Sequence, residues 1–274
     1  MTRQTVSEER SHRGAPAQGE VADAHAAAGR VSIPVAAKSR PLLLGHRGAR
    51  PLSRFKPRPP AAGIPPENSI ACFEYALAHG CDGFEFDVRM TRDGRLLICH
   101  NAWLRGYKVS ASLFDSLCSR CGATLPCLED VLAAFADRAY LDIEVKTAGA
   151  EELIAKALRR YARGQYLLSS FLPEVLRRLH QLDPSLPLGY VCERTASMRI
   201  WRDLPIEVFL PHYELVSEKL VREVHNREMQ VYTWTVNQEK DLLRLAGWGV
   251  DGLISDDPEL LQQTFRVGSP QKLS

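Results

Sequence analysis

Short apolar segments alternate with segments of helical periodicity through most of this 274-residue chain. Counting the segment at 42–45 as the first, eight strand-like segments are separated by helical ones. That count and the chain length favour an α/β fold, a (β/α)8 TIM barrel, over an open doubly wound sheet. We expect strands at 42–45, 83–88, 139–145, 166–170, 187–192, 206–210, 230–236 and 251–255, and helices from the Asn68 N-cap to about His79 and at 128–137, 150–162, 173–181, 217–227 and 238–246.

One apolar segment does not fit this alternation. Residues 96–100 follow the strand at 83–88 after only a short turn, Thr91–Gly94. A parallel crossover needs about a dozen residues, so this segment should fold back as a β-hairpin excursion after the second strand. The excursion could bring His100 back toward Glu85 and Asp87.

The two ends of the chain set the expected domain limits. Residues 1–38 are rich in Ala, Gly, Ser, Arg and Glu without sustained apolar periodicity, which predicts a disordered N-terminal leader before a barrel domain at 39–268. No stretch reaches the roughly 20 apolar residues of a transmembrane helix, and the N-terminus lacks the apolar centre of a signal peptide.

Cysteine usage and charge limit the cellular compartment and the classes of partner that we expect. The seven cysteines are odd in number and lie mostly in apolar runs, which favours reduced thiols in a cytoplasmic protein. The formal net charge of +2 comes without a concentrated basic face, so nucleic acid is not an expected partner. The sequence does not constrain the oligomeric state.

Acidic residues share one face of each of two predicted strands. Glu85 and Asp87 alternate with apolar residues in one strand, and Glu144 and Lys146 do so in another. In a barrel these polar residues face the lumen, where acids are costly to bury without compensation. A divalent cation with hard oxygen ligands, Mg²⁺ or Ca²⁺, would compensate them. The alternative is a charge network without metal, in which Arg47 and Lys146 neutralise the acids.

Two histidines end apolar strands and are followed by loop residues: His46, in Gly45-His46-Arg47-Gly48, and His100. Histidine exchanges protons near neutral pH, so two of them at one phosphorus centre would form an acid/base pair. Arg47 and Lys146 are suited to contact the phosphate, or they simply pair with neighbouring carboxylates.

Taken together, these residues resemble the glycerophosphodiester phosphodiesterase family over about residues 42–262. Successive matches are His46-Arg47-Gly48, Pro66-Glu67-Asn68-Ser69, Gly83-x-Glu85-x-Asp87-Val88, Thr91-x-Asp93-Gly94, the His100 site, Leu125-Pro126-x-Leu128-Glu129-Asp130-Val131-Leu132, Ile143-Glu144-Val145-Lys146, Ser169-Ser170-Phe171, Trp234-Thr235-Val236-Asn237 and Gly249-Val250-Asp251-Gly252. The resemblance implies a (β/α)8 barrel that cleaves glycerophosphodiesters to an alcohol and glycerol 3-phosphate with the help of a metal.

The resemblance also implies roles by position. These are His46 and His100 as the catalytic acid/base pair, Glu85, Asp87 and Glu144 as ligands of the divalent cation, Arg47 and Lys146 as phosphate contacts, Glu67 as a supporting residue, and Trp234 as a wall of the alcohol pocket. Trp234 could instead pack in the barrel lumen. The implied partner is a small-molecule substrate, a glycerophosphodiester or a lysophospholipid.

Three features depart from the family pattern. Asn101 stands where the family usually has Asp after the second histidine, so the charge beside His100 is absent. The usual Leu-x-Arg-Thr-Thr run is replaced by residues 104–108, and the Pro/Arg-rich loop at 50–65 is longer than is common. Substrate contacts of these loops are therefore not predicted.

The mechanism that we expect uses the cation to bind a phosphoryl oxygen and the nucleophilic hydroxyl, with His46 as base and His100 as acid. A cyclic phosphate intermediate and direct hydrolysis both remain open. The alternatives are a lysophospholipase D or a cyclising phospholipase-type lyase on the same barrel, and a non-catalytic phosphoester-binding module.

Overall fold

The computed structural model describes Met1 and residues 40–51, 63–161 and 164–266. All secondary structure in these ranges belongs to one compact unit of residues 31–274. The predicted leader, apart from Met1, and most of the Pro/Arg-rich loop lie outside the described residues. The domain limits therefore stay a prediction.

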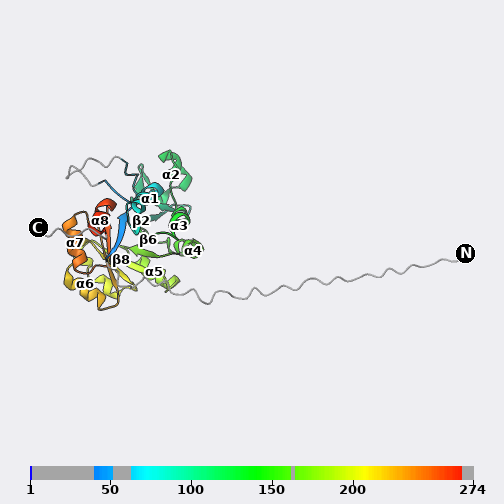
Figure 1. Ribbon diagram of the computed structural model, residues 1–274. Coiled ribbons are helices and arrows are strands. Elements are labelled where there is room, and N and C mark those ends of the chain that lie inside the picture. The colour runs from blue at the N-terminus through cyan, green and yellow to red at the C-terminus, as the bar shows by residue number, and fades with distance from the viewer. Residues whose placement is uncertain (2–39, 52–62, 162–163, 267–274) are drawn as a thin grey trace. The chain divides into compact units, whose positions relative to one another are not determined.

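Eight parallel strands form a closed barrel, as predicted (Figure 1). Each strand pairs with the next, and β1 pairs with both β2 and β11, which closes the ring. The barrel strands are β1 (Leu42–His46), β2 (Gly83–Met90), β6 (Tyr140–Val145), β7 (Tyr166–Ser170), β8 (Leu188–Cys192), β9 (Val208–Pro211), β10 (Gln230–Thr233) and β11 (Gly252–Ser255).

Helices surround this ring. They are α1 (Ile70–Ala78), α3 (Leu128–Phe135), α4 (Glu151–Tyr161), α5 (Pro173–Leu182), α6 (Glu218–His225), α7 (Glu239–Gly247) and α8 (Pro258–Phe265). The last was not predicted, although Pro258 at its first turn and Asp257, whose side chain accepts from the Leu260 amide, are helix-start signals. The connection from β8 to β9 holds two 3₁₀ turns, Thr195–Ser197 and Ile200–Asp203.

The N-cap prediction for α1 is wrong by one residue. Ser69 is the N-cap, because its hydroxyl accepts the Cys72 amide. Asn68 instead adopts a left-handed φ of 57°. Its side chain is thereby directed away from the helix and contacts β2 at Asp87.

The predicted excursion after β2 is confirmed. Strand β3 (Leu96–Ile98) runs antiparallel to β2, with Val88 opposite Ile98. Further elements that were not predicted follow it: a hairpin of β4 (Trp103–Leu104) and β5 (Tyr107–Lys108), a 3₁₀ turn at Val109–Ala111 and helix α2 (Phe114–Cys121). The excursion has a small hydrophobic core of its own, formed by Leu97, Cys99, Val109, Phe114, Leu117 and Cys127.

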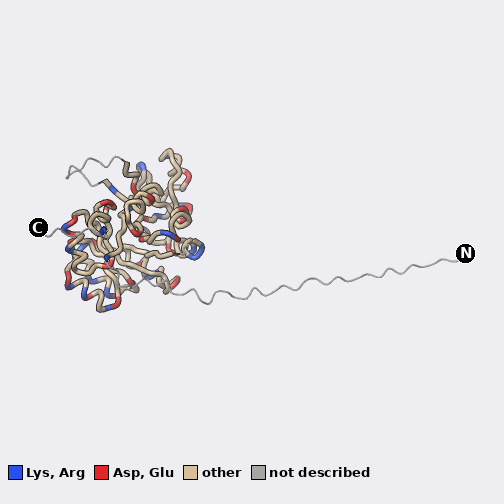
Figure 2. The backbone as a smooth tube through the Cα atoms, viewed as in Figure 1, with Lys and Arg blue, Asp and Glu red and all other residues tan. Residues whose placement is uncertain are grey.

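The apolar faces of the strands pack against the helices. Phe84 and Phe86 of β2 are fully buried, and Phe73 of α1 stacks on Phe84 with ring centroids 4.2 Å apart. The alternate residues of the same strand face the lumen. Lysine and arginine are interspersed with acidic residues along the described chain (Figure 2).

None of the helices in the described ranges combines the length and the apolar character that a membrane span requires. The cytoplasmic location stays a prediction.

Candidate active site

A cavity of about 500 Å³ lies at the carboxyl ends of the barrel strands. TIM-barrel active sites lie at this end of the fold. The residues that line it include most of the predicted site: His46, Arg47, Glu85, His100, Glu144, Lys146 and Trp234, together with Arg50, Asp142, Ser169, Phe171, Val191, Glu193, Leu210, Thr235 and Ile254.

A second cavity, of about 550 Å³, is lined by residues near the opposite strand ends. Among its charged residues, Arg40 pairs with Asp82 at 2.7 Å, and Arg138 pairs with Glu74. It lacks the histidines and the acidic cluster, so we place the active site at the carboxyl ends.

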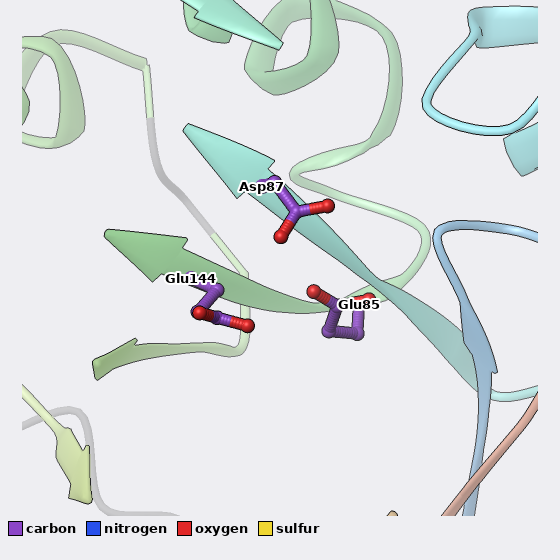
Figure 3. A group of neighbouring side chains, drawn as sticks. All are labelled: Glu85, Asp87 and Glu144. Carbon is purple, nitrogen blue, oxygen red and sulfur yellow. The ribbon is translucent and has the colours of Figure 1, made fainter. Parts of the chain in front are cut away.

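Strand register brings the three predicted metal ligands together. In the pairing of β2 with β6, Glu85 lies opposite Asp142 and Asp87 lies opposite Glu144. One carboxylate oxygen of each predicted ligand lies within 4.8 Å of the others, and Figure 3 shows the three side chains converging from the two strands. All three residues are buried.

The acids of this cluster differ in the direction in which their pKa values are shifted. Burial, reinforced by the neighbouring carboxylates, raises the pKa of Glu85 well above its usual range. Burial also raises the pKa of Glu144 to about 7, although Lys146 opposes this. Burial alone would raise the pKa of Asp87 as well, but Lys146, Arg47 and a hydrogen bond from Asn68 lower it.

The two cations do not satisfy the whole cluster. Lys146 Nζ lies 2.6 Å from Glu144 Oε1 and 3.1 Å from Asp87 Oδ1, and Arg47 Nε lies 3.3 Å from Asp87 Oδ2. Glu85 Oε1 is buried and has no hydrogen-bond partner among the described residues. A buried carboxylate oxygen without a partner, beside two more acids, is what a hard divalent cation would satisfy. The donor set therefore fits Mg²⁺ or Ca²⁺ better than a complete metal-free network.

The turn after β1 explains the glycines beside His46. A Cβ on Gly45 would lie 2.0 Å from the Gly48 carbonyl oxygen, and Gly48 has a φ of 85°, so the turn requires both glycines. The turn directs the Arg47 amide to Glu85 Oε2 at 2.9 Å. The Arg47 guanidinium donates to Glu67 at 3.1 Å.

Glu67 lies at the edge of the site. It pairs with both Arg47 and Arg50 and is not among the residues that line the cavity. Its contacts are those of a residue that holds Arg47 in place.

His46 has a partner that the sequence did not indicate. Its Nδ1 lies 2.7 Å from Asp256 Oδ1, just beyond the end of β11. Asn237 donates to the other oxygen, Oδ2, at 2.7 Å. Burial alone would raise the pKa of Asp256, but the hydrogen bonds from His46 and Asn237 and the nearby Arg50 charge lower it. The polar run Ser255-Asp256-Asp257 after the last strand was the available signal.

His100 lies at the edge of the cavity, beside Asn101. Its Nδ1 donates to Asn101 Oδ1 at 3.0 Å. The Arg89 Nε donates a hydrogen bond to the backbone carbonyl of His100 at 2.8 Å. Burial lowers the pKa of His100, an effect that Asp87 opposes and that Lys146 and Arg47 reinforce. The neighbouring amide contributes no charge of its own.

Trp234 both lines the cavity and packs in the barrel. Its indole Nε1 donates to the Leu210 carbonyl at 3.0 Å, and Phe171 meets it edge-on with centroids 5.6 Å apart. His212 meets the same ring edge-on at 5.4 Å.

Two more polar residues belong to the site, although neither was predicted to have a role in it. Asn68 Nδ2 donates to Asp87 Oδ2 at 2.8 Å, across 19 residues of sequence. Asp142 is fully buried beneath the acidic cluster and accepts the Ser169 hydroxyl at 2.6 Å, and burial raises its pKa to about 7.

Comparison with known proteins agrees with this geometry. Residues 46–118 and 104–260 match the Glycerophosphoryl diester phosphodiesterase family. A glycerophosphodiester phosphodiesterase of Caldanaerobacter subterraneus subsp. tengcongensis is 30% identical over 74% of this chain and 93% of its own length. One from Bacillus subtilis is 28% identical over 82% of this chain and 86% of its own length. An Oleispira antarctica phosphodiesterase, solved with its product sn-glycerol-3-phosphate, shares the fold with a TM-score of 0.68 and 21% identity, covering 82% of this chain and 96% of that one.

Proposed function

The chain belongs to the glycerophosphoryl diester phosphodiesterase family and is a phosphoric diester hydrolase, and from this premise we propose that it hydrolyses glycerophosphodiesters to an alcohol and glycerol 3-phosphate. The observation that carries the proposal is the convergence of two histidines, three buried acids and two basic side chains on one cavity. The product bound to the Oleispira antarctica neighbour supports the choice of glycerol 3-phosphate.

In this proposal Glu85, Asp87 and Glu144 hold a divalent cation. When bound, the cation would act as a Lewis acid, lowering the pKa of a hydroxyl and offsetting negative charge on phosphorus. The ligand assignment is supported by the shared 4.8 Å neighbourhood and by the unpartnered oxygen of Glu85.

His46 is the proposed base. Because the ionised Asp256 accepts from Nδ1–H, the lone pair of the neutral ring is on Nε2. That nitrogen lies 3.8 Å from Glu85 Oε2, beside the acidic cluster. A proton taken from the nucleophile would thus arrive at Nε2, and Asp256 would stabilise the resulting imidazolium.

His100 is the proposed acid. Its Nδ1 is held by Asn101, which leaves Nε2 to donate to the leaving alcohol. A lowered pKa makes the protonated ring a stronger acid, while it reduces the protonated fraction at neutral pH. His100→Ala should therefore reduce turnover by ~10² to 10⁴.

Arg47 and Lys146 are the proposed phosphate contacts. Both pair with site acids in the structure and are nearly buried, so each is held in place before substrate arrives. Trp234 and Phe171 supply the apolar wall of the cavity. An apolar wall of this kind suits the leaving alcohol better than the anionic phosphate.

The experiment that tests the proposal follows glycerol 3-phosphate release from glycerophosphocholine, with and without EDTA, and then with Mg²⁺ or Ca²⁺ added back. We expect activity to disappear with EDTA and to return with one of the cations. Activity that persists in EDTA would refute the metal-dependent reaction, and no activity with any cation would favour a binding module.

Two additions sharpen this experiment. A cyclic phosphate that accumulates instead of glycerol 3-phosphate would indicate a lyase. Release of choline, the alcohol, from lysophosphatidylcholine would indicate a lysophospholipase D. Glu144→Gln should abolish the response to added cation. Glu74→Gln is the matched control, because Glu74 is half exposed and pairs with Arg138 away from the cavity.

A further inference from the structure

Large hydrophobic side chains are exposed on the excursion that follows His100. Trp103 is 61% exposed, Tyr107 40% and Leu113 41%. They are three of only six large hydrophobic residues that are exposed in the described part of the chain, and they fall within eleven consecutive positions. Exposed hydrophobic residues that gather in one short segment are typical of a binding surface.

The same excursion is basic. Residues 101–124 contain three basic residues, Arg105, Lys108 and Arg120, against Asp115 as their one acid. Neither Arg105 nor Lys108 forms an ion pair with a described residue, and both are exposed. Arg120 stacks on Tyr107, with its guanidinium carbon 3.7 Å from the ring centroid. The charges of this surface are therefore available to an anionic partner.

The hairpin presents these residues in a defined arrangement. Trp103 lies opposite Lys108 and Leu104 opposite Tyr107, so the two aromatic rings lie on opposite faces of the hairpin. The turn between them, Arg105-Gly106, has positive φ angles of 49° and 81°. Trp103 and Tyr107 both lie within two residues of this turn, so a surface that meets the tip of the hairpin would be near both rings.

The small core of the excursion supports the hairpin from below. The Val109 amide donates to the Ala102 carbonyl at 2.9 Å, and Val109 is fully buried among Phe114 and Leu117. The exposed aromatic residues thus do not result from a poorly packed segment. In Figure 1 helix α2, which belongs to the excursion, lies outside the other helices.

We propose that the β4–β5 hairpin docks the protein on an anionic phospholipid surface. Trp103 and Tyr107 would enter the headgroup layer, where tryptophan and tyrosine are favoured because one part of each ring system is apolar and another polar. Arg105, Lys108 and Arg120 would face the lipid phosphates. Because His100 precedes Trp103 by three residues, docking would hold the cavity entrance near the lipid.

The test is co-sedimentation of the full chain with vesicles, measured without substrate. One set contains phosphatidylcholine alone and the other equal amounts of phosphatidylcholine and phosphatidylglycerol. We expect binding to the mixed vesicles that weakens as salt is added. Neutralising Lys108 with Lys108→Gln should reduce the partition coefficient about fivefold, and Trp103→Ala should reduce it by about tenfold or more.

Leu243→Ala is the matched control, because Leu243 is 47% exposed on α7, outside the excursion. It should bind vesicles like the wild type. The Trp103→Ala/Tyr107→Ala variant should lose vesicle binding and keep its turnover of soluble glycerophosphocholine. Unchanged binding by this variant, or no binding by the wild type, would overturn the proposal. So would a loss of self-association in the variant without any vesicle binding by the wild type, which would assign the surface to contacts between copies. Since binding is measured without substrate, the binding outcomes are independent of the proposed activity.

Discussion

The Nδ1 atom of His46 lies 2.7 Å from Oδ1 of Asp256, although 210 residues separate them in sequence. His46 ends the first barrel strand and Asp256 follows the last, and Gly45 pairs with Ser255 between these strands. Closure of the barrel therefore creates this contact. Asn237 donates to the other carboxylate oxygen, Oδ2, at 2.7 Å. The orientation of the His46 imidazole therefore depends on Asp256 and, through it, on Asn237.

Asp256→Asn should reduce kcat by roughly 10²- to 10⁴-fold, with a smaller effect on KM. An amide can donate to Nδ1, which would leave the proton of the neutral ring on Nε2, the wrong nitrogen for a base. Steady-state kinetics with glycerophosphocholine at saturating cation would measure this loss.

The same strand offers a matched control. Asp251, just before β11, also pairs with a histidine, His225, at 2.8 Å, but at the opposite end of the barrel. Asp251→Asn should leave kcat within about twofold, since exposed pairs contribute little. Equal losses in both variants would show that the Asp256 effect is structural.

Asn101→Asp should extend activity to higher pH. A carboxylate beside His100 stabilises the imidazolium and raises a pKa that burial now lowers. If protonated His100 is the acid, activity falls as pH rises through its pKa, so the alkaline limb of the pH–rate profile should shift upward by up to about one unit.

The control is Asn101→Ala, which removes the hydrogen bond to Nδ1 and adds no charge. It should not shift the alkaline limb upward. A limb that stays in place in Asn101→Asp would mean that His100 is not the proton donor whose titration limits the rate.

The periodicity of the chain was sufficient to predict the barrel, because each strand and most helices carry their own apolar pattern. It was also sufficient for the excursion, since the turn Thr91–Gly94 is too short for a parallel crossover. Helix α2 was missed because it buries only two residues, Phe114 and Leu117, on a local core, so its apolar pattern is weak. Gly122, which ends it at a φ of 65°, was the available signal.

Periodicity again made it possible to predict site residues that lie on strands. Residues within one strand, such as Glu85 and Asp87, share a face by alternation, and the acids on β6 follow the same rule. Asn68 and Asp256 reach the site from loops, where no period relates position to direction. Asn68 stands where an N-cap is expected. Its left-handed backbone, which the sequence does not reveal, directs its side chain to Asp87 instead.

Asn68→Ala should destabilise the protein by about 2–5 kcal/mol and reduce activity. The buried Asp87 loses a hydrogen bond, which costs roughly 1–3 kcal/mol, and alanine in the left-handed conformation costs about 1–2 kcal/mol more. Urea unfolding in the presence of EDTA would measure the change without any contribution from bound cation.

Asn68→Gly separates the two contributions, because glycine adopts positive φ without strain. It should lose the hydrogen bond and remain more stable than Asn68→Ala by about 1 kcal/mol. If the two variants were equally stable, the left-handed backbone at position 68 would carry no cost.

Added cation should stabilise the protein more at alkaline than at acidic pH. The folded-state pKa of Glu144 is about 7, above its ordinary value of 4.5, so the folded protein binds more protons than the unfolded chain between these values. In EDTA, the contribution of Glu144 to stability should therefore be greatest at pH values below its ordinary pKa and fall as pH rises toward 7. A cation that replaces these protons should raise Tm by roughly 5–10 °C near pH 8 and by much less near pH 5, where protons compete for the ligands.

Glu144→Gln tests whether this pH dependence belongs to the acidic cluster. The amide cannot ionise, so the variant should lose less stability between about pH 5 and pH 8 in EDTA and should respond only weakly to Mg²⁺ or Ca²⁺. Glu151→Gln is the matched control, because Glu151 is buried on α4 and accepts from the Gly149 amide outside the cavity. A wild-type cation response that is equal at both pH values, or that survives in Glu144→Gln, would place the cation elsewhere, because a site made of these carboxylates must release their protons to bind it.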